Sequence, residues 1–301
     1  MTTHADSLTK KRIHRNAVLL LCFCALLWSM AGVVTRQLER AESFEVTFWR
    51  SLFCVLGVGG ALAFRQGNPL RPLIAMGKPG LISGLMWAVM FTCFMVALTR
   101  TTVANVLLVS SLSPFLAALL AWLVLGERIL TKTWLAIAAA AFGIWWMVRD
   151  GVSSQGIAGM VIALGVPIAA AINLVILRKM RARVDLAPAV LLGGLISCAA
   201  TLPAAWPLSV TPNDLGILAF LGFFQLALPC VLLVGVARHL APQEIALIAL
   251  LEIVLGSLFA WAGAGEALSA STLQGGAIVL TALIGNELLP NERPNAVAGA
   301  R

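Results

Sequence analysis

The sequence predicts an all-α integral membrane protein, with ten transmembrane helices arranged as two inverted five-helix repeats around a central cavity. Three observations predict this fold: the composition, the length of the apolar stretches and an internal repeat. Apolar residues make up 60% of the 301 residues and charged residues 11%, whereas soluble domains have about 45–50% and about 25%. A soluble protein of this size cannot bury so much apolar surface, so the chain is expected to lie in a lipid bilayer.

The apolar residues fall into stretches that have the length of membrane-spanning helices. A helix needs about 20 apolar residues to cross the ~30 Å hydrocarbon core of a bilayer. Strands of a membrane β-barrel are about ten residues long and alternate polar with apolar residues, which this sequence does not do. Ten stretches have the length of a spanning helix: residues 16–36, 45–64, 79–99, 103–125, 133–148, 157–177, 188–206, 214–236, 243–264 and 270–289.

The basic residues orient these helices. If the first helix starts inside the cell, the inside segments hold sixteen lysines and arginines and the outside segments hold four. This asymmetry is the positive-inside pattern, and it predicts a bacterial-type inner membrane protein with both termini in the cytoplasm. The net charge of +8 is therefore assigned to membrane orientation, and no nucleic-acid partner is expected. Residues 10–34 also have the pattern of a signal peptide, but they are long enough to span, so we interpret them as an uncleaved first helix.

Several kinds of site are not predicted. The six cysteines lie inside predicted helices and the three histidines lie at or beyond helix ends, so no disulfide framework, metal site or other cofactor is expected. The sequence contains no GxxxxGK[ST] stretch, so the protein is not expected to hydrolyse ATP itself.

An internal repeat divides the chain into two halves. Residues 112–133 (LSPFLAALLAWLVLGERILTKT) and 251–272 (LEIVLGSLFAWAGAGEALSAST) match at eight of twenty-two positions, at a constant offset of 139. The predicted organisation is a cytoplasmic tail over 1–15, five-helix repeats over 16–150 and 151–289, and a cytoplasmic tail over 290–301. Because five is odd, the second repeat enters the membrane from the opposite side, and inverted repeats of this kind are typical of secondary transporters.

The same segments resemble the drug/metabolite transporter superfamily, and specifically its EamA-type ten-helix exporters. The helix LSPFLAALLAWLVLGE at 112–127 ends in the family's GE, and LEIVLGSLFAWAGAGE at 251–266 is a second copy with Ile253 where the family often has proline. The segments VTFWR at 46–50 and VALTRTTVANVLLVSSLSP at 96–114 also fit the family's pattern. The resemblance, which is nearest to the bacterial aromatic-amino-acid exporters, implies ten helices around a central cavity and export of amino acids or similar metabolites.

Glu252 is the main candidate for a functional residue. It follows Gln243 by nine residues, which places it roughly 14 Å along its helix, near the bilayer midplane. An ionisable side chain there costs about 2.5–3.5 kcal/mol on insertion scales. Glu252 could bind a substrate ammonium group or exchange a proton; the alternative is a hydrogen bond that only locks helix packing. Its counterpart in the first half is Ser113.

Arg50 is the second charged candidate, near the outer end of its predicted helix. It could snorkel to the membrane interface, form a gate with Glu45, or contact a substrate carboxylate. Glu127 and Glu266 follow glycines at helix ends, and we expect them to cap neighbouring helices.

Polar and aromatic residues elsewhere in the helices are further candidates. We expect a cavity lined by Ser110, Ser113, Asn105, Asn173, Gln225 and Gln243, with an apolar wall that includes Trp28 and Trp87. Plain helix packing is the alternative for each of them. Pro114, Pro167 and Pro229 lie inside predicted helices and should produce kinks.

These features predict a secondary transporter that exports small metabolites, amino acids foremost, by alternating access, with proton coupling as one way to drive it. The protein is not expected to be an enzyme, and a monomer is compatible with the prediction. Two alternatives stay open: a passive facilitator or channel, and a membrane-embedded enzyme acting on a lipid carrier. The enzyme would need several acids, histidines or arginines converging at one membrane face, whereas here they are scattered.

Overall fold

The computed structural model describes residues 2–35, 37–41, 43–66, 70–101, 103–149, 156–180, 186–264 and 270–289. The described residues form helices, turns and loops, with no β-strand among them. The elements are α1 (Thr2–Ser29), α2 (Ala31–Thr35), α3 (Ser43–Gln66), α4 (Leu70–Ala75), α5 (Gly77–Arg100), α6 (Val103–Ser110), α7 (Ser113–Leu125), α8 (Thr131–Val148), α9 (Ile157–Ala163), α10 (Gly165–Met180), α11 (Ala187–Ala205), α12 (Pro212–Phe220), the π-helix η2 (Leu221–Ala227), α13 (Leu228–Val236), α14 (Pro242–Ala249), α15 (Leu251–Ala264) and α16 (Ala270–Leu288).

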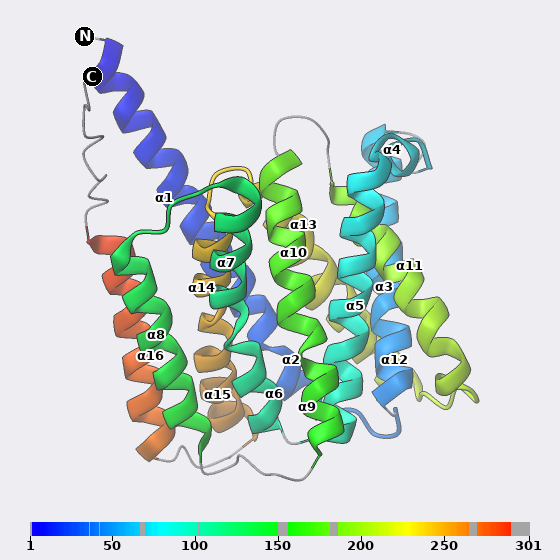
Figure 1. Ribbon diagram of the computed structural model, residues 1–301. Helices are drawn as coiled ribbons and strands as arrows, with labels where there is room; N and C mark the ends of the chain where they lie inside the picture. The colour runs from blue at the N-terminus through cyan, green and yellow to red at the C-terminus, as the bar shows by residue number, and fades with distance from the viewer. Residues whose placement is uncertain are drawn as a thin grey trace.

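Eight segments of the described chain are long and apolar enough to cross a membrane. They are Lys11–Thr35, Phe44–Phe64, Gly77–Ala97, Leu108–Leu125, Ile157–Met180, Ala187–Ala205, Pro212–Val236 and Pro242–Phe259. Each falls on one of the predicted apolar stretches. The two remaining stretches fold as α8 and α16, which have 18 and 19 residues and pack side by side at one edge of the molecule (Figure 1). The first helix begins at Thr2, well before the predicted start at residue 16.

The helix α11 packs closely against both α3 and α5. A Cβ added to Gly193 of α11 would lie 2.4 Å from the Cβ of Trp87 and 3.0 Å from a backbone oxygen of α5. Ser197 of α11 also receives a hydrogen bond from Ser51 at 3.1 Å and lies 3.2 Å from the hydroxyl of Thr92. Small residues and interhelical hydroxyl bonds are what holds helices together in lipid, so these three helices form a tight group.

The pair formed by α8 and α16 is fastened in a similar way. Gly143 and Gly275 bring the two backbones together, because a Cβ added to Gly275 would lie 2.4 Å from the carbonyl oxygen of Gly143. Thr133 donates a hydrogen bond to Asn286 at 3.0 Å. Figure 1 places the α8–α16 pair and the α3–α5–α11 group on opposite flanks, with the interrupted helices between them.

Interruptions occur in five of the spanning segments, and three of them coincide with the prolines that sequence predicts as kinks. In the structure, Pro114, Pro167 and Pro229 lie within the first three residues of α7, α10 and α13. Proline lacks an N–H and fixes its own φ, so it is tolerated in a first turn and disfavoured in a helix interior. Pro114 and Pro167 therefore lie just after short turns that separate two helices, whereas Pro229 directly follows the π-helical turn η2 inside one helical stretch.

A further interruption has no proline. Helix α14 ends at Ala249 and α15 starts at Leu251, with Leu250 in a turn between them. The turn between α6 and α7 comprises Ser111 and Leu112, so the offset of 139 places the two breaks at equivalent positions. The sequence predicts a single helix over 243–264, and this break was not anticipated.

Candidate functional site

A cavity of about 220 Å³ lies among the interrupted helices. It is bounded by parts of α1, α2, α3, α5, α6, α7, α10, η2, α13, α14 and α15. Eight of the residues expected to form a site line it: Trp28, Arg50, Trp87, Ser110, Ser113, Asn173, Gln225 and Glu252. The structure thus brings together residues that are more than 200 positions apart in the sequence.

Two predicted lining residues lie elsewhere. Asn105 is fully buried between helices and donates a hydrogen bond to Thr101 at 2.8 Å. Gln243 is buried in the first turn of α14. Neither belongs to the described lining of the cavity, so the expectation that they line it is wrong for this conformation.

The interruptions place the ends of three helices at the cavity. Ser110 is the last residue of α6 and Ser113 the first of α7, while Glu252 is the second residue of α15. The Ile253 N–H is bonded to the Leu250 carbonyl oxygen at 3.0 Å, but the start of a helix still carries a partial positive charge, which favours a carboxylate. The break at Leu250 therefore gives Glu252 a setting that an uninterrupted helix would not supply.

Arg50 points into the molecule and not toward the membrane interface. It lies seven residues after Ser43, the first residue of α3, or roughly 10 Å along the helix. Its Nη1 donates to the sulfur of Met95 on α5 at 3.7 Å, and its Nε has no partner. The guanidinium and the Glu252 carboxylate interact electrostatically, and both line the cavity.

The proposed gate between Arg50 and Glu45 is not present. Glu45 is buried and accepts hydrogen bonds from the backbone N–H groups of Ser209 and Val210 and from the Ser209 hydroxyl at 3.1 Å. Its two oxygens thus hold the loop before α12 in place. The prediction of a Glu45 partner for Arg50 is wrong because these backbone donors already occupy the carboxylate.

Three buried polar atoms of lining residues have no partner within the protein. They are Nε of Arg50, Nε1 of Trp87 and Oε1 of Gln225. Trp87 and Gln225 are each only 3% exposed, and the amide nitrogen of Gln225 donates to the carbonyl oxygen of Trp28 at 3.2 Å. An unpaired buried polar atom costs free energy, so these donors and this acceptor are available to hydrogen-bond a polar molecule in the cavity.

Asn173 adds an oriented amide to the wall. It is 1% exposed, and its Oδ1 accepts a hydrogen bond from Ser83 of α5 at 2.6 Å. This bond fixes the side chain against α5.

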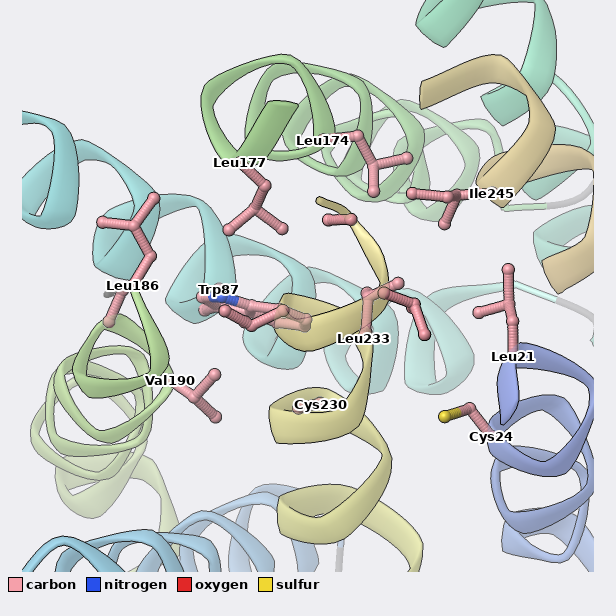
Figure 2. Close-up of a cluster of buried hydrophobic side chains, with 14 of the residues drawn as sticks. Leu21, Cys24, Trp87, Leu174, Leu177, Leu186, Val190, Cys230, Leu233 and Ile245 are labelled. Carbon is pink, nitrogen blue, oxygen red and sulfur yellow. The ribbon is translucent and has the colours of Figure 1, made fainter. Parts of the chain in front are cut away.

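The remaining wall is apolar and partly aromatic. The rings of Trp87 and Phe91 lie 5.7 Å apart at 40°, and Phe94 continues the same side of α5. Figure 2 shows Leu174 of α10 and Ile245 of α14 facing one another, with Leu233 of α13 below them, in the same cluster of buried side chains as Trp87. The cavity thus pairs a small number of polar groups with an apolar surface, as ligand pockets usually do.

An ion pair lies beyond this apolar cluster, on the face where α1 begins and α16 ends (Figure 1). Arg178 of α10 donates to Glu127 at 3.0 Å and to the carbonyl oxygen of Leu240 at 3.2 Å. The sequence predicts Glu127 as a helix cap, and the structure shows an ion pair instead. Gly126 ends α7 with a φ of 66°, as expected, whereas Glu266 lies outside the described residues.

The described residues contain no group of three or more histidines, cysteines, aspartates or glutamates that could hold a metal ion. The six cysteines are free thiols.

Comparison with known proteins gives a family and a fold. The model of the EamA-like transporter family matches residues 15–149 and again residues 157–286. The pseudopaline exporter CntI is 24% identical over 281 residues in two Pseudomonas aeruginosa strains, UCBPP-PA14 and PAO1, covering 90% of this chain and 95% of the exporter. A protein of known crystal structure, 17% identical, matches 93% of this chain and 100% of its own with a TM-score of 0.79, which shows a shared fold.

Proposed function

The chain belongs to the EamA-like transporter family, and from this premise we propose that it is a secondary transporter that exports small zwitterionic metabolites, amino acids foremost, by alternating access. Substrate is bound in the cavity that contains Arg50 and Glu252. The single observation that carries the proposal is this cavity, which combines one acidic group, one basic group and unpaired polar atoms with an apolar aromatic wall.

The proposed architecture has ten spans in two inverted repeats, over residues 16–150 and 151–289. Three findings support it. The family model matches the chain twice, in segments that nearly coincide with these halves. The α6–α7 and α14–α15 breaks stand at equivalent repeat positions, and α8 and α16, the last helices of the two halves, pack together. Two similar halves that exchange conformations can open one cavity to either side at nearly equal energy.

The chemistry of the lining supports a zwitterionic substrate. An ammonium group would be attracted to the Glu252 carboxylate, and the Gln225 oxygen that lacks a partner can accept its hydrogen bonds. The rings of Trp28, Trp87 and Phe91 give an apolar or aromatic side chain a surface to pack on. This combination favours amino acids with apolar side chains over strongly charged or very polar metabolites.

The direction of transport is inferred from the relatives and the charge pattern. The Pseudomonas aeruginosa relatives are named as exporters of pseudopaline, which supports export here as well. The positive-inside pattern supports an inner-membrane location with both termini in the cytoplasm. α1 begins and α16 ends on one face of the molecule (Figure 1), in keeping with that orientation.

Glu252 also offers a means of coupling. A carboxylate that binds either a proton or a substrate ammonium group, but not both, would exchange one for the other across the membrane. Export would then be driven by protons that enter the cell.

Counterflow in reconstituted vesicles tests the proposal. Vesicles loaded with unlabelled phenylalanine or leucine should accumulate the labelled amino acid transiently above its equilibrium level, because exchange requires a carrier that faces both sides in turn. A passive facilitator would equilibrate the label without an overshoot. Absence of counterflow for every amino acid in a panel, together with no thermal stabilisation of the purified protein by any of them, would contradict the proposed substrate class.

A further inference from the structure

We infer that Arg50 binds the carboxylate of the substrate, so that a zwitterion lies in one orientation in the cavity and joins the two halves of the protein through its two charges. The inference rests on the proposed function and adds the residue, and the orientation, that select a zwitterion. It is carried by the unsatisfied guanidinium of Arg50 and by the distribution of charge between the halves.

The bonding of Arg50 is incomplete inside the protein. A guanidinium has five N–H donors in a planar fork, but its described hydrogen bond goes to the Met95 sulfur, a weak acceptor, and its Nε has no partner. An arginine within a membrane-spanning segment is costly and normally pairs with an acceptor. The nearest acidic residue on the same helix, Glu45, is occupied by Ser209 and Val210.

The missing acceptor has a recognisable chemistry. A planar fork of donors binds a carboxylate through two parallel hydrogen bonds, and Trp87 contributes another unpaired N–H to the same cavity. Both donors would be satisfied by an oxyanion, and neither would be satisfied by an ammonium group. The cavity thus has an anion-binding part in addition to the cation-binding part around Glu252.

The two charges belong to different halves of the chain. Arg50 is the one basic residue among the described residues that line the cavity, and Glu252 is the one acidic residue. Arg50 lies in the first half and Glu252 in the second. The repeat does not duplicate the Glu252 carboxylate, because Ser113 stands at its equivalent position, and α11, the second helix of the second half, contains no charged residue.

This asymmetry fixes how a substrate is held. An α-amino acid directs its carboxylate to the first half and its ammonium group to the second, and in doing so it contacts both halves. An analogue with only one of the two charges pairs with either Arg50 or Glu252. The other of these two side chains then stays buried without an ionic partner, which costs free energy. Selection therefore acts on the presence of both charges together.

Binding of matched compounds tests the inference. Phenylalanine and leucine would each be compared with the amide, which lacks the carboxylate, and with the deaminated acid, which lacks the ammonium group. Affinity is measured by competition against labelled amino acid and by thermal shift. Wild-type protein should bind each amino acid about 10- to 100-fold more tightly than either analogue, since a hydrogen bond to a charged group contributes about that factor.

Variants of Arg50 and Glu252 separate recognition of the carboxylate from recognition of the ammonium group. Arg50→Gln should abolish the preference for the amino acid over its amide while keeping the preference over the deaminated acid. Glu252→Gln should do the reverse. Arg50→Lys, which keeps the charge but loses the planar fork, should retain part of the preference. Arg149, whose guanidinium lies 3.8 Å from the Trp146 ring at the end of α8, is the matched control, and Arg149→Gln should leave both preferences unchanged.

Thermal unfolding without ligand distinguishes binding from a structural role. If Arg50 serves the substrate, Arg50→Gln should melt close to the wild-type temperature, because it removes a guanidinium with an unpaired Nε but also removes the attraction to the Glu252 carboxylate, and these effects have opposite signs. A lower melting temperature with an unchanged preference for the amino acid over its amide would overturn the inference but leave the proposed transport function standing. Failure of wild-type protein to bind either amino acid would instead reject both.

Discussion

The Nε of Arg178 lies 3.0 Å from Oε1 of Glu127, and this ion pair ties the end of α10 to the residue that follows the C-terminal glycine of α7. The two residues belong to different halves of the chain. Nη1 of Arg178 also donates to the carbonyl oxygen of Leu240, between α13 and α14, at 3.2 Å. The contact lies on the face where α1 begins and α16 ends (Figure 1), which we propose is cytoplasmic, and Leu174, Leu233 and Ile245 belong to the same buried cluster (Figure 2). We therefore expect the ion pair to stabilise a conformation that is closed on the inner side.

Removal of either partner should weaken this closed conformation. The side chains of Glu127 and Arg178 are 28% and 21% exposed, so solvent screens the pair and its contribution is expected to be about 1 kcal/mol. Glu127→Gln and Arg178→Gln should each lower the melting temperature of the purified protein slightly. The melting temperature of the double variant should fall by less than the sum of the two single decreases, because the interaction between the two side chains can be lost only once.

Lys132 provides the control for this comparison of single and double variants. It donates to the carbonyl oxygens of Asn286 and Leu289 within the α8–α16 pair, at 2.8 and 2.6 Å, and takes no part in the Glu127–Arg178 contact. Lys132→Gln should combine additively with Glu127→Gln. Strict additivity between Glu127→Gln and Arg178→Gln would show that the ion pair contributes nothing to stability.

Glu252→Gln should uncouple transport from protons. The amide keeps the size and hydrogen-bonding capacity of the side chain but cannot release a proton, so an imposed pH difference should no longer drive amino-acid movement. Counterflow should also fall by about tenfold or more, because the ammonium group loses its charged partner. The measurement is the rate of labelled amino-acid transport with and without a pH gradient. A variant that still responds to the gradient as wild type does would reject coupling at Glu252.

Gly275→Ala should destabilise the α8–α16 pair. The added methyl would lie 2.4 Å from the Gly143 carbonyl oxygen and 2.7 Å from the Met147 backbone nitrogen, so one helix must shift, at a cost of about 1–3 kcal/mol. A lower melting temperature is the expected result. Gly235→Ala on α13, where nothing lies within 4 Å of the added carbon, should leave the melting temperature within about 1 °C of wild type or raise it slightly. Equal changes in melting temperature at the two positions would show that the close contact between Gly143 and Gly275 does not contribute to stability.

The sequence predicts the membrane-spanning segments well because their signal is local. An unbroken run of apolar residues is sufficient, and eight such segments are found where they are expected. The polar part of the described lining was predictable for a related reason. A polar or charged residue deep in an apolar helix normally faces the protein interior, so Glu252 and Gln225 are predicted without knowledge of their contacts, whereas for Arg50 the sequence also allows a position at the membrane interface. Asn105 met the same criterion, but Thr101 one turn earlier satisfies its amide, and the sequence alone does not reveal that bond.

Other features of the site have weak local signals or none. The break at Leu250 contains no proline or glycine, and only the repeat, which aligns it with the turn at Ser111 and Leu112, could have indicated it. The π-helical turn η2, which places Gln225 beside the cavity, also has no distinctive sequence pattern. The partners of Glu45 and Glu127 are 164 and 51 residues away. Contacts over such separations depend on how the helices pack, and composition and spacing do not determine that.

Alternating access requires a cavity that opens to the two sides of the membrane in turn. Ser113→Cys, in a chain whose six native cysteines have been replaced, places one reactive thiol in the lining, and a membrane-impermeant maleimide can be applied to either face. We expect labelling from both faces and protection by bound amino acid. Adding Glu127→Gln should raise the labelling rate from the inner face and lower the rate from the outer face by a similar factor. A thiol reached from one face only, or rates that rise together on both faces, would contradict alternating access.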